Sequence, residues 1–164
     1  MRTLREVGPL GVVVALVGGV TWMLLSGHDA LGVWLLAGLL LAHGLVHVMF
    51  LVPSPPHTVV PSTDGPDWPF DLGQSWLAGR LGTGAVRMVG RYLVIAVVAL
   101  AALAALGTVG VPMSSARWAA LVVGSAGASL VLLAIDFRPS LALGVAIDLA
   151  LLWLALWSSW TPVS

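Results

Sequence analysis

Five apolar segments, each about as long as a bilayer is thick, occupy most of this chain of 164 residues. A membrane crossing needs a helix of about 20 mostly apolar residues, because hydrocarbon offers no partner for backbone polar groups. The sequence therefore predicts an all-α fold, a polytopic transmembrane helical bundle that comprises residues 1–164 as a single domain. The predicted spans are about 9–26, 30–52, 85–110, 115–135 and 140–160.

The composition excludes several classes of protein. Hydrophobic residues make up 59% of the chain and charged residues 9%, which is incompatible with a soluble domain. The net charge is zero and there is no basic tract, so nothing indicates nucleic-acid binding. Without cysteine, the chain has no disulfide, no thiol nucleophile and no thiolate ligand for a metal.

Proline and polar residues mark the connections between the spans. Pro53, Pro55 and Pro56 end the second span, because proline lacks a backbone donor and restricts the residue before it. They open a long loop, 53–84, whose second half, Phe70 to Leu81, alternates apolar and polar residues. That pattern predicts a short interfacial helix on the cytoplasmic surface.

The first span has an alternative interpretation as a signal peptide, because Arg2 and Arg5 precede it. Its end, Leu25-Ser26-Gly27-His28, is a poor match to the small residues at a cleavage site. We expect the segment to stay in the protein.

Arginine placement predicts the orientation, because cytoplasmic loops retain positive charge. We expect a multi-pass plasma-membrane protein with its N-terminus in the cytoplasm, because in that orientation only Arg117 lies outside. Indole rings settle at the membrane interface, which predicts an outer belt of tryptophans. The cytoplasmic arginines are Arg2, Arg5, Arg80, Arg87, Arg91 and Arg138, and the outer tryptophans are Trp22, Trp118, Trp157 and Trp160.

Four ionisable side chains share one depth in the inner half of the membrane. At about 1.5 Å per residue, His43, His47, Arg91 and Asp148 all lie roughly 8 to 15 Å from the cytoplasmic ends of their helices. A charge in hydrocarbon costs several kcal/mol unless it is paired or hydrated. These four residues are therefore the predicted ligand-binding site.

His43 and His47 stand at positions i and i+4, so their rings project from one helix face. This spacing can chelate one metal ion, although the glutamate of hydrolytic zinc motifs is absent. The alternative is structural: one ring bonds a neighbouring helix and the other points at the loop. A second, looser set of possible metal ligands is His57, Asp64, Asp67 and Asp71.

Asp148 lies in an otherwise apolar helix, and Arg91 is its expected partner because a guanidinium binds a carboxylate through two hydrogen bonds. Such a pair can also serve only to fix helix packing. The small residues 124–129 predict that the fourth span is central, and Gly44 leaves backbone open to close approach. Gly18 and Gly19 could join the first helix to this bundle or to a second copy of it.

Three short motifs resemble a group of small uncharacterised integral membrane proteins of actinobacteria, which share a His-Gly-Leu/Ile-x-His helix motif. The matching segments are 42–47, 84–91 and 144–149, and the resemblance covers about three quarters of the chain, from His43 on. The group resembles four-helix proteins, so the first helix of this chain departs from it. The resemblance implies a topology and supplies no reaction.

Two classes of function follow from these residues. In the first, a non-enzymatic membrane protein binds or passes a small amphipathic ligand, a lipid or a proton at the buried polar site. In the second, a membrane enzyme uses His43 or His47 as general base or metal ligand; no nucleophile or phosphate loop accompanies them, which favours the first class. The sequence requires no cofactor. Its expected partners are the lipid bilayer, a second copy of the chain, or a larger membrane complex to which it is an accessory subunit.

Overall fold

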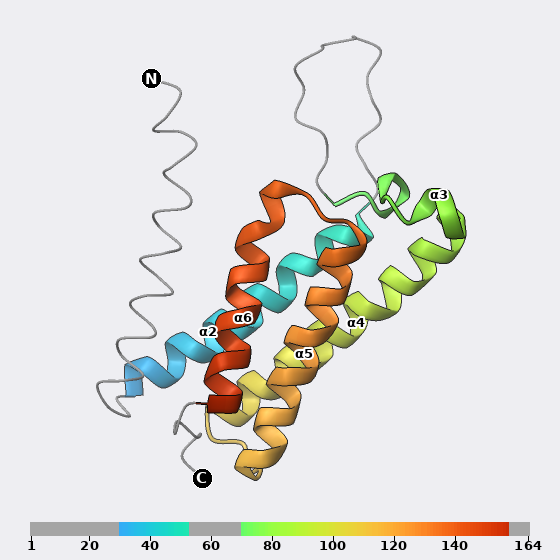
Figure 1. The fold of residues 1–164 in the computed structure, drawn as a ribbon. Coiled ribbons are helices and arrows are strands. Elements are labelled where there is room, and N and C mark those ends of the chain that lie inside the picture. The colour runs from blue at the N-terminus through green and yellow to red at the C-terminus, as the bar shows by residue number, and fades with distance from the viewer. Residues whose placement is uncertain (1–29, 53–69, 158–164) are drawn as a thin grey trace, which may run out of the picture.

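The computed structural model of the protein describes residues 30–52 and 70–157, which form helices joined by short connections. The long helices follow the apolar segments, and single-turn helices flank them (Figure 1). In chain order the elements are α2 (Ala30–Val46), η1 (His47–Leu51), η2 (Leu72–Gln74), α3 (Ala78–Leu81), α4 (Thr83–Thr108), α5 (Ser115–Ile135), η3 (Pro139–Leu141) and α6 (Ala142–Trp157).

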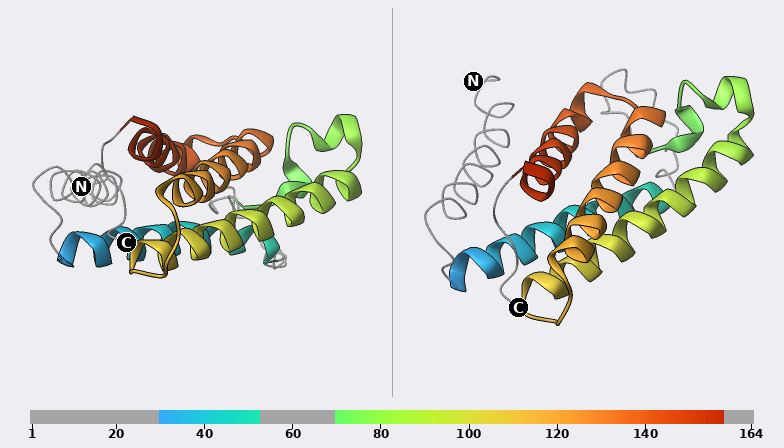
Figure 2. Two further views of the ribbon diagram at one scale, coloured as in Figure 1. Left: turned by 90° about the horizontal axis from the view of Figure 1, so that it is seen from below. Right: turned by 60° about the horizontal axis from the view of Figure 1, so that its bottom comes forward.

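The four long helices pack in two layers. Helices α2 and α4 lie side by side in one layer, and α5 and α6 form the other (Figure 2, left). From the end of the bundle that carries α3, α4 runs away, α5 returns and α6 runs away again (Figure 1). This arrangement brings α2, α5 and α6 together in the half of the bundle that carries α3.

Within residues 30–52 and 70–157, three helical segments are long and apolar enough to cross a membrane: Ala30–Leu51 with 22 residues, Thr83–Thr108 with 26 and Ser115–Ile135 with 21. They correspond to the second, third and fourth predicted spans. Helix α6 is apolar but has only 16 residues, or roughly 24 Å, which is shorter than a bilayer core of about 30 Å. The predicted span 9–26 lies outside the described residues. The described chain is thus all-helical and suited to a membrane, and the count of five spans stays a prediction.

Small residues set the distances between helices. A Cβ atom on Gly44 of α2 would lie 2.9 Å from the Cβ atom of Ala101 in α4, closer than two carbons can pack. Helix α5 packs against both α4 and α6, and its Ser125 hydroxyl donates to the backbone oxygen of Val97 in α4 at 3.1 Å. The close approach at Gly44 is confirmed, whereas the central place predicted for α5 is shared with α4, which packs against both α2 and α5.

We expect Gly44→Ala to destabilise the protein by about 1 to 3 kcal/mol, because the added methyl group pushes α2 away from α4. Gly38 is the matched control, since a Cβ atom there has no neighbour within 4 Å and the residue is on the same helix. Gly38→Ala should add about 0.5 to 1 kcal/mol of stability by lowering the entropy of the unfolded chain. Unfolding in mixed detergent micelles measures both, and equal effects would contradict the tight contact.

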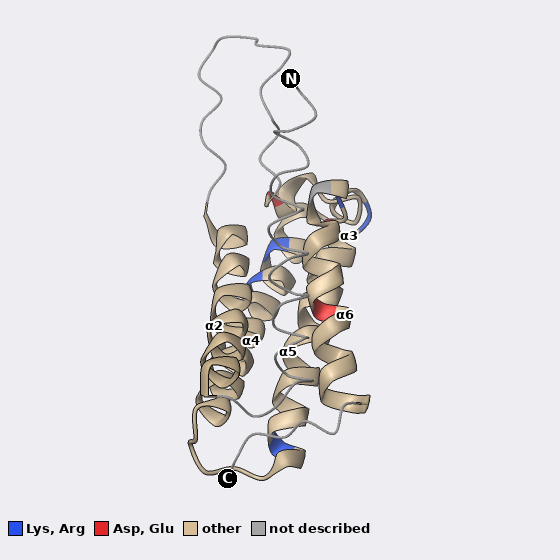
Figure 3. Cartoon of the chain, turned by 90° about the vertical axis from the view of Figure 1, so that its left-hand side faces the viewer, with Lys and Arg blue, Asp and Glu red and all other residues tan. Residues whose placement is uncertain are grey.

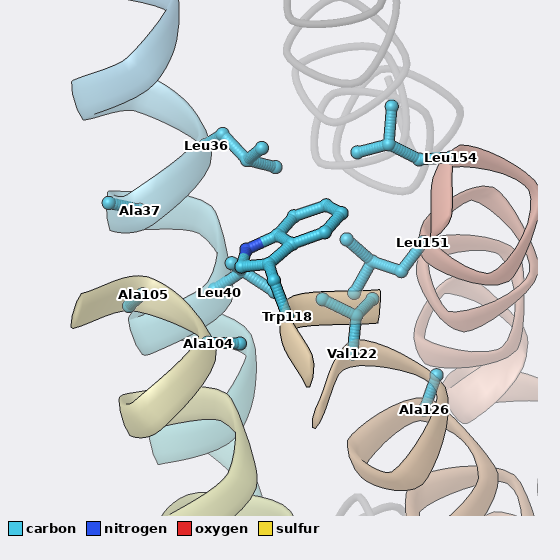
Figure 4. Close-up of a cluster of buried hydrophobic side chains, with 10 residues drawn as sticks. All are labelled: Leu36, Ala37, Leu40, Ala104, Ala105, Trp118, Val122, Ala126, Leu151 and Leu154. Atoms are coloured by element: carbon cyan, nitrogen blue, oxygen red, sulfur yellow. The ribbon is translucent and has the colours of Figure 1, made fainter. Parts of the chain in front are cut away.

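A tryptophan fills the centre of the half of the bundle that lies away from α3. The Trp118 side chain is 1% exposed and lies among Leu36, Leu40 and Leu151, from the other layer and from α6 (Figure 4). Its indole Nε1 donates to the Thr108 hydroxyl at 3.0 Å, and that hydroxyl donates to the backbone oxygen of Ala104. The prediction that Trp118 belongs to an interfacial belt is therefore wrong.

Trp157 is 73% exposed at the end of α6, as an interfacial residue would be. Trp22 and Trp160, the other members of the predicted belt, lie outside the described residues.

The segment from Phe70 to Leu81 forms the short helices η2 and α3, and the expected single amphipathic helix does not form. Ser75 and Trp76 donate from their side chains to the backbone oxygens of Ile135 and Ala134, which end α5 without helical partners. Leu72 packs directly onto Gly90, where the missing side chain makes room. The segment is thus docked on the bundle by polar and apolar contacts together.

Candidate functional site

Four buried polar side chains meet where α2, α5 and α6 approach one another. His43 comes from the last turn of α2, His47 from the start of η1, Ser129 from α5 and Asp148 from α6. Ser129 and Asp148 are 0% exposed, His47 3% and His43 7%. We call these four residues the buried polar network.

The network is closed by four hydrogen bonds. His43 Nε2 lies 2.8 Å from Asp148 Oδ1, and Ser129 Oγ lies 2.6 Å from Asp148 Oδ2. Ser129 Oγ also lies 2.7 Å from His47 Nε2, and His47 Nδ1 lies 2.9 Å from the backbone oxygen of His43. The two imidazole rings stand edge to face with centroids 5.0 Å apart. Each of the four side chains therefore has a polar partner although the surrounding bundle is apolar.

Three of the four residues predicted to share a site come together here: His43, His47 and Asp148. Ser129 was not predicted, because its sequence context of Gly and Ala made it look only like a small packing residue. The available signal was its position: a hydroxyl on a helix that packs against neighbours on two sides needs a polar partner when it is buried.

The expected ion pair between Arg91 and Asp148 does not form. Both carboxylate oxygens of Asp148 are occupied by His43 and Ser129, and the Arg91 side chain is exposed on α4. The buried face of α4 carries Val86, Gly90 and Val94, so Arg91 falls one position away from it. Arg91 thus belongs to another part of the molecule.

The histidine pair is arranged for hydrogen bonding. Both ring nitrogens of His47 are used, so a metal ion shared with His43 would have to replace existing hydrogen bonds. Within residues 30–52 and 70–157, no group of three or more His, Asp or Glu side chains is placed to hold a metal. Of the looser predicted set, only Asp71 is described; His57, Asp64 and Asp67 lie outside.

A serine, a histidine and an aspartate in contact invite comparison with a nucleophilic triad. In a triad the histidine lies between the two others, accepts the serine proton and is held by the carboxylate. Here Ser129 lies between His47 and Asp148, and its hydroxyl is wholly buried. The order of the groups is that of a hydrogen-bonded chain and does not activate the hydroxyl as a nucleophile.

Charged residues gather at the end of the bundle that carries α3, and the middle of the bundle shows one acidic position, on α6 (Figure 3). At that end Arg87 lies 3.7 Å from Asp71, and Arg138 lies 3.5 Å from Asp136. Burial raises the pKa of Asp136, and the neighbouring Arg138 opposes that rise. Arg91 makes no hydrogen bond or ion pair with any of the described residues.

A pocket of about 340 Å³ opens beside Arg91. Its walls come from η1, from the segment around η2 and from α4, and include Phe50, Phe70, Leu72, Arg87 and Arg91. Phe50 is shared with the buried polar network, because its ring stacks on the ring of His47 with centroids 6.3 Å apart. The pocket and the network are therefore neighbours that share one aromatic side chain.

Comparison of the chain with protein-family models, with characterised proteins and with solved structures finds no match. The likeness of its motifs to small actinobacterial membrane proteins stays a prediction.

Proposed function

We propose that this protein is an integral membrane protein whose buried polar network binds one exchangeable proton. The observation that carries the proposal is the closed set of four hydrogen bonds among His43, His47, Ser129 and Asp148. Each hydrogen bond needs one hydrogen atom, so the hydrogens that these groups can supply can be counted.

The count starts at the hydrogen bond between His47 Nδ1 and the backbone oxygen of His43, where the donor is known. The backbone oxygen of His43 can only accept, so His47 must carry hydrogen on Nδ1. If His47 is neutral, its Nε2 is then a bare acceptor. Ser129 has a single hydroxyl hydrogen and stands between that nitrogen and a carboxylate oxygen of Asp148. One hydroxyl hydrogen cannot serve both contacts.

An ionised Asp148 with two neutral histidines and one serine supplies three hydrogens for the four hydrogen bonds: one each from His43 Nε2, His47 Nδ1 and Ser129 Oγ. The fourth must be an additional proton, either on His47 Nε2 or on Asp148 Oδ2. Either placement makes the network neutral overall, which suits an apolar surrounding because an unpaired charge there is costly.

The two placements are connected through Ser129. When His47 carries the proton, its Nε2 donates to Ser129 and the hydroxyl donates to Asp148. When Asp148 carries it, the carboxyl donates to Ser129 and the hydroxyl donates to His47. Conversion shifts two hydrogens along existing hydrogen bonds, moves no heavy atom far and keeps the network neutral. The network can therefore pass a proton between α6 and η1.

We place the protein in the plasma membrane with the end that carries α3 facing the cytoplasm. Arg80 lies in α3, Arg87 and Arg91 in the first three turns of α4 and Arg138 between α5 and η3, all towards that end, whereas Arg117 begins α5 at the other. In this orientation the network lies in the cytoplasmic half of the bundle, and the N-terminus is cytoplasmic with one further span before Ala30.

The proton count can be tested at pH 7 in lipid vesicles. We expect ¹⁵N spectra of labelled histidine and the infrared carboxyl stretch, assigned with Asp148→Asn, to show one additional proton in total. It will appear as a cationic His47, as a protonated Asp148 or as a mixture of both. An ionised Asp148 together with two neutral histidines in the folded protein would disprove the proposal.

Two variants serve as matched controls, because each removes hydrogen bonds without removing the carboxylate. His47→Phe leaves two hydrogen bonds, which His43 and Ser129 can supply unaided, so the additional proton should disappear. Ser129→Ala removes the bridge, and again the remaining contacts need no additional proton. A protonated carboxyl that persists unchanged in both variants would show that burial alone holds it.

A further inference from the structure

We propose that the pocket beside Arg91 binds the phosphate group of an anionic phospholipid, with Arg91 as its principal contact. This site is distinct from the proton network, and the proposal does not depend on that network's function. It rests on the charges, the walls and the place of the pocket in the bundle.

The charges in the pocket leave one arginine uncompensated. Arg87 and Arg91 are one helical turn apart on α4, so their guanidinium groups project to the same side. Asp71 lies 3.7 Å from Arg87, and its carboxylate also accepts from the backbone nitrogen of Gly73 at 2.9 Å. Arg91 has no such partner among the described residues. The pocket therefore offers net positive charge to a ligand.

The remaining walls are apolar. Phe50 and Phe70 meet edge to face with ring centroids 5.2 Å apart, and Leu72 lies beside them. A volume of about 340 Å³ is at the lower end of small-molecule sites and is far larger than a bare phosphate ion requires. A ligand that matches both features has an anionic head and an apolar remainder.

The place of the pocket selects a lipid among such ligands. Arg91 lies in the third turn of α4, about 12 Å from the first residue of the helix, so its long side chain can reach towards headgroups on the side where we place the cytoplasm. A guanidinium binds phosphate oxygens through two parallel hydrogen bonds, which a lysine cannot do. The glycerol and first methylene groups of a lipid would then contact the aromatic walls.

The test uses the full-length protein, purified in a non-ionic detergent free of phosphate, and a short-chain phosphatidylglycerol as the probe. Binding is measured by native mass spectrometry and by ³¹P chemical shift. We expect Arg91→Gln to weaken binding at least tenfold, the loss of one charge-assisted contact. Arg91→Lys should recover only part of it, and Arg117→Gln, at the opposite end of the bundle, should bind like the wild type.

Competition with inorganic phosphate distinguishes a lipid phosphate group from a free phosphate ion as the ligand of this pocket. We expect it to compete only at much higher concentration, because it cannot use the apolar walls. If it binds as tightly as the lipid, the pocket is a site for a free anion and the lipid proposal is wrong. If Arg91→Gln binds lipid as well as Arg117→Gln does, the pocket is not the site at all. Circular dichroism verifies that both variants are folded, as their exposed positions predict.

Discussion

Replacing Asp148 with alanine should lower the free energy of unfolding by about 3 to 5 kcal/mol, because the carboxylate holds two other buried polar groups in place. His43 Nε2 and Ser129 Oγ both lose their partner on α6 in this variant. The buried polar network is also the polar connection between α6 and α2, so its loss removes a link between the two layers.

Leu149→Ala is the control, because Leu149 follows Asp148 on the same helix but is 56% exposed. We expect it to change stability by less than about 1 kcal/mol when both variants are unfolded in mixed detergent micelles and followed by circular dichroism. Replacing the whole network by apolar residues of similar volume should be milder than Asp148→Ala, since no polar group is then left unpaired. Equal stability of Asp148→Ala and Leu149→Ala would mean that the network is loose or hydrated.

Trp118→Ala should cost a similar amount, about 3 to 5 kcal/mol, for a different reason. The indole occupies the space between α2, α5 and α6, so its removal leaves a cavity lined by Leu36, Leu40 and Leu151. The hydroxyl of Thr108 also loses the indole as a donor, although it keeps its own bond to Ala104.

Trp34→Ala is the matched control for Trp118→Ala, because the Trp34 side chain is 65% exposed on α2. Trp118→Phe should fall between the two, since it keeps most of the ring volume and loses the hydrogen bond. Thermal unfolding of the three variants under one set of conditions orders them. A Trp118→Ala protein as stable as Trp34→Ala would contradict the buried position of the indole.

The helices could be predicted from sequence because apolar length and proline are strong local signals. Pro53 and Pro112 lie just beyond described helices. The close packing predicted for the small residues of α5 occurs at Gly124 and Ser125, whereas a Cβ atom on Gly127 would have no neighbour within 4 Å. The conformation of the segment from Phe70 to Leu81 could not be predicted in the same way. It depends on hydrogen bonds to the carbonyl oxygens at the end of α5, which are distant in sequence and which no local pattern reveals.

The candidate site shows the same difference between features set by local sequence and features set by contacts with distant residues. Depth along a helix follows from counting residues, and it correctly grouped His43, His47 and Asp148. Rotation about the helix axis depends on which face packs against neighbours, and this is where the assignment of Arg91 failed. Ser129 was missed because serine is both small and polar. The sequence does not show which of these two properties matters, since that depends on the residues that surround the side chain in the fold.

Phe50 has a consequence for how fast the network can exchange with water. Its ring stacks on the ring of His47 and also lines the pocket. A benzene ring has no group that can relay a proton, so on this side exchange must wait until the ring swings aside. We therefore expect the kinetics of protonation to report the rotation of one phenylalanine, and to be slow compared with the chemistry of a freely hydrated histidine.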